Sequence, residues 1–148
     1  MIDIAPRMAA NSRPWPLTTD ARRQLIDEIA RLRHEVVALA GQGLEEGIVS
    51  LPVAFAERRL DTLTGVLSRA ELVGDAGCAA IGRRATLRDD GGHSTTYDIV
   101  FPGDGDPTRG RISADSPLGK AILGAEAGDV VHVTAPSGGW SVTVISVE

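Results

Sequence analysis

Few side chains in this 148-residue sequence have types and spacing suited to chemistry, and the most suggestive are two adjacent carboxylates, Glu45 and Glu46. Carboxylate oxygens are the ligands that Mg²⁺ prefers, so the pair is a candidate for binding a metal ion. Adjacent side chains on a regular helix point about 100° apart, so the two carboxylates would converge only in a loop. The simpler interpretation, which we favour, is that the two residues are solvated acids at the polar tip between two predicted helices and bind no metal.

Other reactive residues form no recognisable catalytic set. His34, His93 and His132 fall in different segments, at no spacing typical of zinc ligands. Cys78 is the single cysteine, which excludes an internal disulfide and fits a reducing cytosol. No serine–histidine–aspartate or cysteine–histidine arrangement can be placed. We therefore expect a protein that is not an enzyme and carries no cofactor.

The most informative segment of the chain is Ile112–Val133. Ser116 is suited to cap a helix, because its hydroxyl can accept a hydrogen bond from a free backbone N–H. Pro117 would occupy the first helical position, where its missing N–H costs nothing. Gly124 is a natural helix end. The pattern predicts a short helix followed by a strand over Val130–Thr134.

Two longer helices are predicted ahead of this segment, one from Thr19 or Asp20 to about Ala40 and one from just after Ser50 to about Leu72. In both, apolar residues are spaced 4, 3, 4, 3, which is typical of a coiled-coil seam: Leu25, Ile29, Leu32, Val36 and Leu39, then Ala56, Leu60, Leu63, Leu67 and Ala70. Two such helices joined by a short loop imply an antiparallel hairpin. Since only two apolar stripes pack together, we expect the hairpin to be stabilised by packing against the rest of the chain.

After Gly74–Gly77 the hydrophobic period changes from that of a helix to that of strands. The fold class is therefore α+β: an antiparallel helical hairpin, then an antiparallel sheet with one short helix. We divide the chain into a flexible tail (1–16), a coiled-coil hairpin (17–73) and a sheet domain (78–148). Within the tail, Trp15 is expected to be a partly exposed anchor.

The composition excludes several classes of function. The net charge is −5, which disfavours direct binding of nucleic acid and suits a protein partner with a basic face. No apolar run approaches about 18 residues, so no transmembrane helix is expected. The first residues lack the apolar core of a secretion signal, so we expect a cytoplasmic protein.

The Ile112–Val133 segment resembles the C-terminal domain of the bacterial Gre transcript-cleavage factors (GreA, GreB and Rnk). The matching residues are Ile112-Ser113, Ser116-Pro117-Leu118, Lys120–Gly124 and Gly128–Val131, and the family's Tyr-x-Ile-Val strand and Pro-x-Gly turn match Tyr97–Val100 and Pro136–Gly138. The resemblance implies an FKBP-like sheet domain behind a coiled coil.

The same resemblance implies a partner and a binding surface. Gre-like proteins bind bacterial RNA polymerase at its secondary channel, with the C-terminal domain on the rim and the coiled coil inside. By this resemblance the rim contact falls on Ser113, Asp115, Ser116, Pro117 and Leu118. A monomer suits such an inserted hairpin.

The chain departs from the cleavage factors at the hairpin tip. Those factors carry an Asp-x-x-Glu pair there, whereas this chain has Glu45 and Glu46 side by side. The hairpin is also shorter by roughly a dozen residues, which is about six residues per arm, or about 10 Å of reach. We therefore expect a regulator that inhibits transcription without stimulating RNA cleavage. The alternatives are a cleavage factor that uses Glu45 and Glu46, and an FKBP-like prolyl isomerase, for which the domain has few aromatic side chains.

Overall fold

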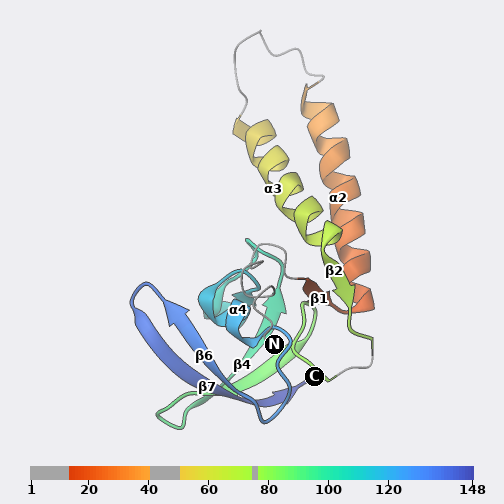
Figure 1. Ribbon diagram of the computed structural model, residues 1–148. Helices are drawn as coiled ribbons and strands as arrows, with labels where there is room; N and C mark the ends of the chain where they lie inside the picture. Colours follow the sequence, from red (N-terminus) through yellow and green to blue (C-terminus); the bar gives the residue numbers. More distant parts are fainter. Residues whose placement is uncertain (1–13, 41–50, 75–76) are drawn as a thin grey trace, which may run out of the picture.

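The computed structural model describes residues 14–40, 51–74 and 77–148, and it shows two long helices projecting from a sheet domain (Figure 1). The elements in chain order are β1 (Trp15–Leu17), α2 (Thr19–Ala40), α3 (Leu51–Ser68), β2 (Ala70–Leu72), β3 (Arg84–Arg88), β4 (Ser94–Val100), a 3₁₀ turn (Pro107–Arg109), β5 (Arg111–Ser113), α4 (Pro117–Ile122), β6 (Val130–Ala135) and β7 (Gly138–Val147). The predicted α+β class is confirmed. Among the described residues, no helix is long and apolar enough to cross a membrane.

Helices α2 and α3 form the predicted hairpin and pack through the predicted seams. The buried seam residues are Leu25, Ile29, Leu32, Ala56 and Leu63. Val66 is also buried although it lies off the seam, because an α-helix of 3.6 residues per turn drifts away from a strict 3.5-residue repeat. The residues at the hairpin tip, Glu45 and Glu46 included, lie outside the described residues.

The residue that caps α2 differs from the prediction. Thr18, rather than Thr19 or Asp20, accepts a hydrogen bond through Oγ1 from the Ala21 N–H, at 3.0 Å. This is the geometry of an N-cap, which satisfies one of the free backbone donors of the first turn. The chain therefore leaves strand β1 and enters helix α2 without a linker.

Two boundary predictions were wrong, and both errors have one cause. Trp15 and Pro16 belong to strand β1 rather than to a flexible tail, whereas residues 1–13 lie outside the described residues. Helix α3 ends at Ser68 instead of about Leu72. The parallel pairing of β1 with β2, in which the Trp15 N–H donates to the Arg69 carbonyl at 2.8 Å, joins segments over fifty residues apart. Local periodicity cannot reveal such a long-range pair.

The larger sheet has the strand order β5-β4-β3-β7-β6. Three of its neighbouring pairs are antiparallel, but β4 and β5 are parallel, so the sheet is mixed rather than purely antiparallel as predicted. The chain leaves β4, passes through the 3₁₀ turn and returns beside β4 in the same direction. Helix α4 packs against β6 and β5.

Strand β1 joins the hairpin to the sheet domain. The Ile81 N–H donates to the Pro16 carbonyl at 2.8 Å, and the Thr18 N–H donates to the Ile81 carbonyl at 3.1 Å. Gly82 has φ +99°, and a Cβ there would collide with the Thr18 hydroxyl. Leu17 is fully buried, and one continuous cluster of buried side chains runs from the hairpin into the sheet. The base of the hairpin is therefore packed against the sheet domain, as predicted.

Replacing Leu17 with alanine should lower the free energy of unfolding by about 2–5 kcal/mol, because a cavity would open in the shared core. Its register partner Leu72 is 51% exposed and provides a matched control. We expect Leu72→Ala to cost less than about 1 kcal/mol. Urea denaturation followed by circular dichroism measures both values, and equal losses would contradict a central role for Leu17.

Candidate partner-binding site

The predicted rim residues lie together at the end of β5 and the first turn of α4; we call residues 113–118 the contact segment. Asp115 and Pro117 are exposed, whereas Ser113 and Ser116 are half-buried. Leu118 is half-buried and packs against the core. The contact segment thus exposes the Asp115 carboxylate and the rigid Pro117 ring to solvent, while the Leu118 side chain anchors the segment to the core.

Ser116 holds the contact segment in shape. Its Oγ accepts from the Gly119 N–H at 3.0 Å and donates to the Ser113 carbonyl at 2.7 Å. The Ser116 N–H donates to the same carbonyl at 3.0 Å. The predicted N-cap is confirmed. Because these bonds exist before any partner arrives, little conformational entropy remains to be lost on binding.

The Asp115 carboxylate is oriented by its neighbour, since the Ser113 hydroxyl donates to Asp115 Oδ1. Beside it lies a groove of about 630 Å³ between the β1–β2 pair and α4. On the far side of the groove, the Arg69 guanidinium lies 5.9 Å from the centre of the Trp15 ring. Trp15 is half-buried, as expected of an anchor. An exposed, oriented carboxylate beside a groove is suited to a protein partner that offers a cation and an apolar group.

Sequence reasoning missed Gly119, on which the contact segment depends. Gly119 is buried on α4, and a Cβ there would overlap the Ser113 carbonyl oxygen and lie 3.0 Å from the Ala114 Cα. Only glycine lets the first turn of α4 approach the end of β5 this closely. The available signal was a glycine inside a predicted helix, which usually has a packing reason.

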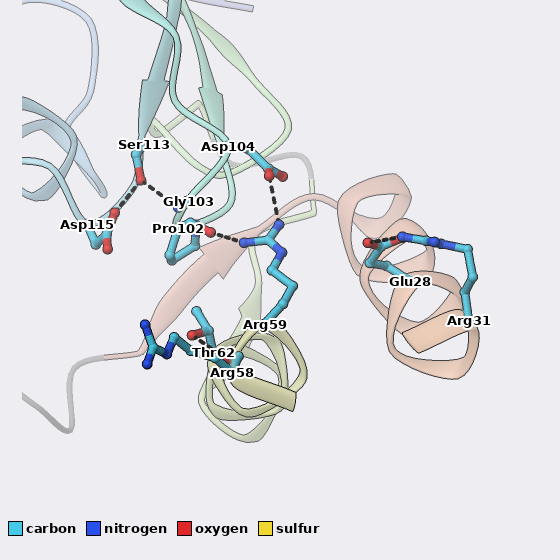
Figure 2. A network of polar contacts seen from close by, with 10 residues as sticks. All are labelled: Glu28, Arg31, Arg58, Arg59, Thr62, Pro102, Gly103, Asp104, Ser113 and Asp115. Atoms are coloured by element: carbon cyan, nitrogen blue, oxygen red, sulfur yellow. Dashed lines mark hydrogen bonds and ion pairs between the residues drawn. The ribbon is translucent and has the colours of Figure 1, made fainter. Parts of the chain in front are cut away.

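Sequence reasoning also missed Arg59, because an arginine beside an apolar seam is typical of a solvated helix face. From α3 it donates to the Pro102 carbonyl, and its Nη2 lies 2.8 Å from Asp104 Oδ1 (Figure 2).

Figure 2 also shows Arg31 bonded to Glu28 on α2. The hydrogen bond from Arg31 lowers the pKa of the Glu28 carboxyl, and the charge of Arg59 lowers it further.

No metal site accompanies the contact segment. Within residues 14–40, 51–74 and 77–148, no three side chains of the histidine, cysteine, aspartate and glutamate types are grouped so that they could hold a metal ion. The candidate pair Glu45 and Glu46 lies outside those ranges, so its role remains a prediction from the sequence.

Comparison with known proteins identifies the family. A family model described as "Transcription elongation factor, GreA/GreB, C-term" matches residues 74–148. The transcription elongation factor GreA of Chloroflexus aurantiacus is 35% identical over 136 residues, which cover 88% of this chain and 85% of that protein. The chain belongs to the GreA/GreB family. The resemblance read from the contact segment and its surroundings is therefore confirmed.

Other relatives extend the similarity over more of the chain. The GreA of Bacillus cytotoxicus is 29% identical over 157 residues, covering 94% of this chain and 99% of that protein. Among solved structures, Gfh1 of Thermus aquaticus aligns with 92% of this chain at 25% identity, with 99% of its own chain covered and a TM-score of 0.43. The sequence similarity to the GreA of Bacillus cytotoxicus includes the hairpin as well as the sheet domain, because it covers 94% of this chain.

The close approach of Gly119 can be tested by substitution with alanine. Gly119→Ala should lower the free energy of unfolding by about 1–3 kcal/mol or more, because the added methyl group forces α4 away from β5. Gly65 on α3 has no atom within 4 Å of the corresponding Cβ position. The control Gly65→Ala should therefore raise stability by about 0.5–1 kcal/mol. Thermal unfolding measures both, and an unchanged melting temperature for Gly119→Ala would contradict the account.

Proposed function

We propose that this GreA/GreB-family protein is a transcription regulator that binds bacterial RNA polymerase at the secondary channel. The contact segment binds the channel rim, and the hairpin enters the channel. The observation that carries the proposal is the Asp115 carboxylate, which is exposed, oriented by Ser113 and set beside the exposed ring of Pro117. A rim that offers a basic side chain next to an apolar one would complement it.

The direction of the hairpin supports the second half of the proposal. Helices α2 and α3 project together away from the sheet domain (Figure 1). The 22 residues of α2 span about 33 Å, and two packed helices are about 20 Å across. Once the sheet domain is held at the rim, a rod of this size would obstruct whatever else uses the channel.

The protein would inhibit transcription by obstruction and would perform no catalysis of its own. The tip sequence around Glu45 and Glu46 lacks an Asp-x-x-Glu pair, and metal coordination tolerates errors of only about 0.2 Å. A hairpin shorter by about 10 Å would not bring carboxylates to a metal deep in the channel. In this proposal the protein acts in the cytoplasm as a monomer, without a cofactor.

Asp115→Asn should weaken binding to RNA polymerase by about ten- to a hundredfold, because an amide of the same size cannot replace a charged hydrogen-bond acceptor. Asp90 lies exposed in the turn between β3 and β4 and undergoes the same loss of charge in Asp90→Asn. The Asp90→Asn control should bind within about twofold of the parent, since scattered surface charges contribute little. Immobilised polymerase and surface plasmon resonance give both affinities.

Equal affinity for the parent and Asp115→Asn would show that the contact segment does not face the polymerase. An equal loss in both variants would assign the effect to net charge instead of to the site. A parent protein that does not bind polymerase at all would refute the proposed function.

A further inference from the structure

Arg59 joins the hairpin to the loop between β4 and β5. Its side chain is 23% exposed and extends from α3 toward the start of that loop (Figure 2). One guanidinium nitrogen donates to the carbonyl of the buried Pro102, and Nη2 pairs with Asp104 Oδ1 at 2.8 Å. The planar fork of arginine can hold two acceptors in a fixed relative position, which a lysine cannot. Arg59 therefore fixes both the position and the orientation of the loop against α3.

The opposite side of the same loop touches the contact segment. The Gly103 N–H donates to Ser113 Oγ at 3.4 Å, and that hydroxyl donates onward to Asp115. Gly105 packs so closely on Ser113 that a Cβ would lie 2.8 Å from the Ser113 nitrogen. A continuous chain of polar contacts thus runs from the hairpin, through residues 102–105, to the carboxylate of the contact segment (Figure 2).

We infer that Arg59 is a positioning residue, which sets the direction of the hairpin relative to the contact segment. This inference rests on the proposed function, because it gives the relative direction of the two parts a role in transcription. The strand β1 junction fixes only the base of the hairpin, whereas Arg59 braces α3 from the side. Without that brace the hairpin would tilt about its base while the contact segment, held by Ser116 and Gly119, kept its shape.

The inference predicts that polymerase affinity and inhibition of nucleotide addition respond differently to the loss of Arg59. Arg59→Ala should leave affinity for polymerase within about threefold of the parent, since the bonds of Ser116 and the close packing of Gly119 hold the contact segment without Arg59. Its inhibition of nucleotide addition should fall about tenfold, because a tilting hairpin enters the channel less often. Asp115→Asn should instead lose inhibition only in proportion to its lost affinity. The matched control is Arg58→Ala, one residue away on the same helix with an exposed side chain.

The direction of the hairpin can be measured on the protein alone. Spin labels are attached to cysteines introduced at Val37 on α2 and Val130 on β6, which are 72% and 69% exposed, in a Cys78→Ser background. Double electron–electron resonance then gives the distribution of distances between hairpin and sheet. We expect Arg59→Ala to broaden this distribution by about twofold or more, and Arg58→Ala to leave it unchanged.

A second variant, Asp104→Asn, keeps the inference testable if Arg59→Ala fails to fold. It removes the ion pair and keeps the Pro102 bond, so the distribution should broaden by a smaller amount. Unchanged distributions in both variants, or equal broadening in Arg58→Ala, would overturn the inference. So would a loss of polymerase affinity in Arg59→Ala as large as that in Asp115→Asn. If the parent does not bind polymerase, the proposed function fails, whereas the spin-label distances still decide whether Arg59 sets the hairpin direction.

Discussion

The burial of Leu17 between the hairpin and the sheet is the constraint on which the rest of the structure depends. Two helices with one apolar stripe each cannot bury enough surface to be stable alone. The hairpin gains the missing burial at its base, where strand β1 pairs with β2 on one side and with Ile81 on the other. Because Leu17 lies in the continuous cluster of buried side chains that both parts share, we expect the hairpin and the sheet to unfold together.

A shared core at the base also gives the hairpin a fixed direction, which the proposed role in the channel requires. The hairpin keeps one direction relative to the sheet domain only if its support is rigid. That support consists of backbone pairing at β1 and side-chain bonds from Arg59. The contact segment is built in the same way, with a serine cap and a buried glycine in place of a flexible loop. The contact segment and the hairpin therefore occupy fixed positions relative to each other.

The parts that could be predicted from the sequence are those set by local rules. The seams through Leu25 and Leu63, the cap at Ser116 and the strand that begins at Val130 each depend on neighbours within a few positions. The parallel pairs could not be predicted, because they join segments that periodicity treats separately. The same is true of the Arg59 pair with Asp104, since an arginine on a helix surface has the same local pattern whether or not a distant loop lies opposite it.

In the proposed function, a directed hairpin obstructs the channel and ends short of the catalytic metal. The most direct measurement adds the protein to stalled, backtracked polymerase complexes with end-labelled RNA and follows both RNA length and subsequent nucleotide addition. We expect an unchanged RNA length and slower nucleotide addition. Shortening of the RNA from its 3′ end would contradict it, because carboxylates of the tip would then have reached the metal.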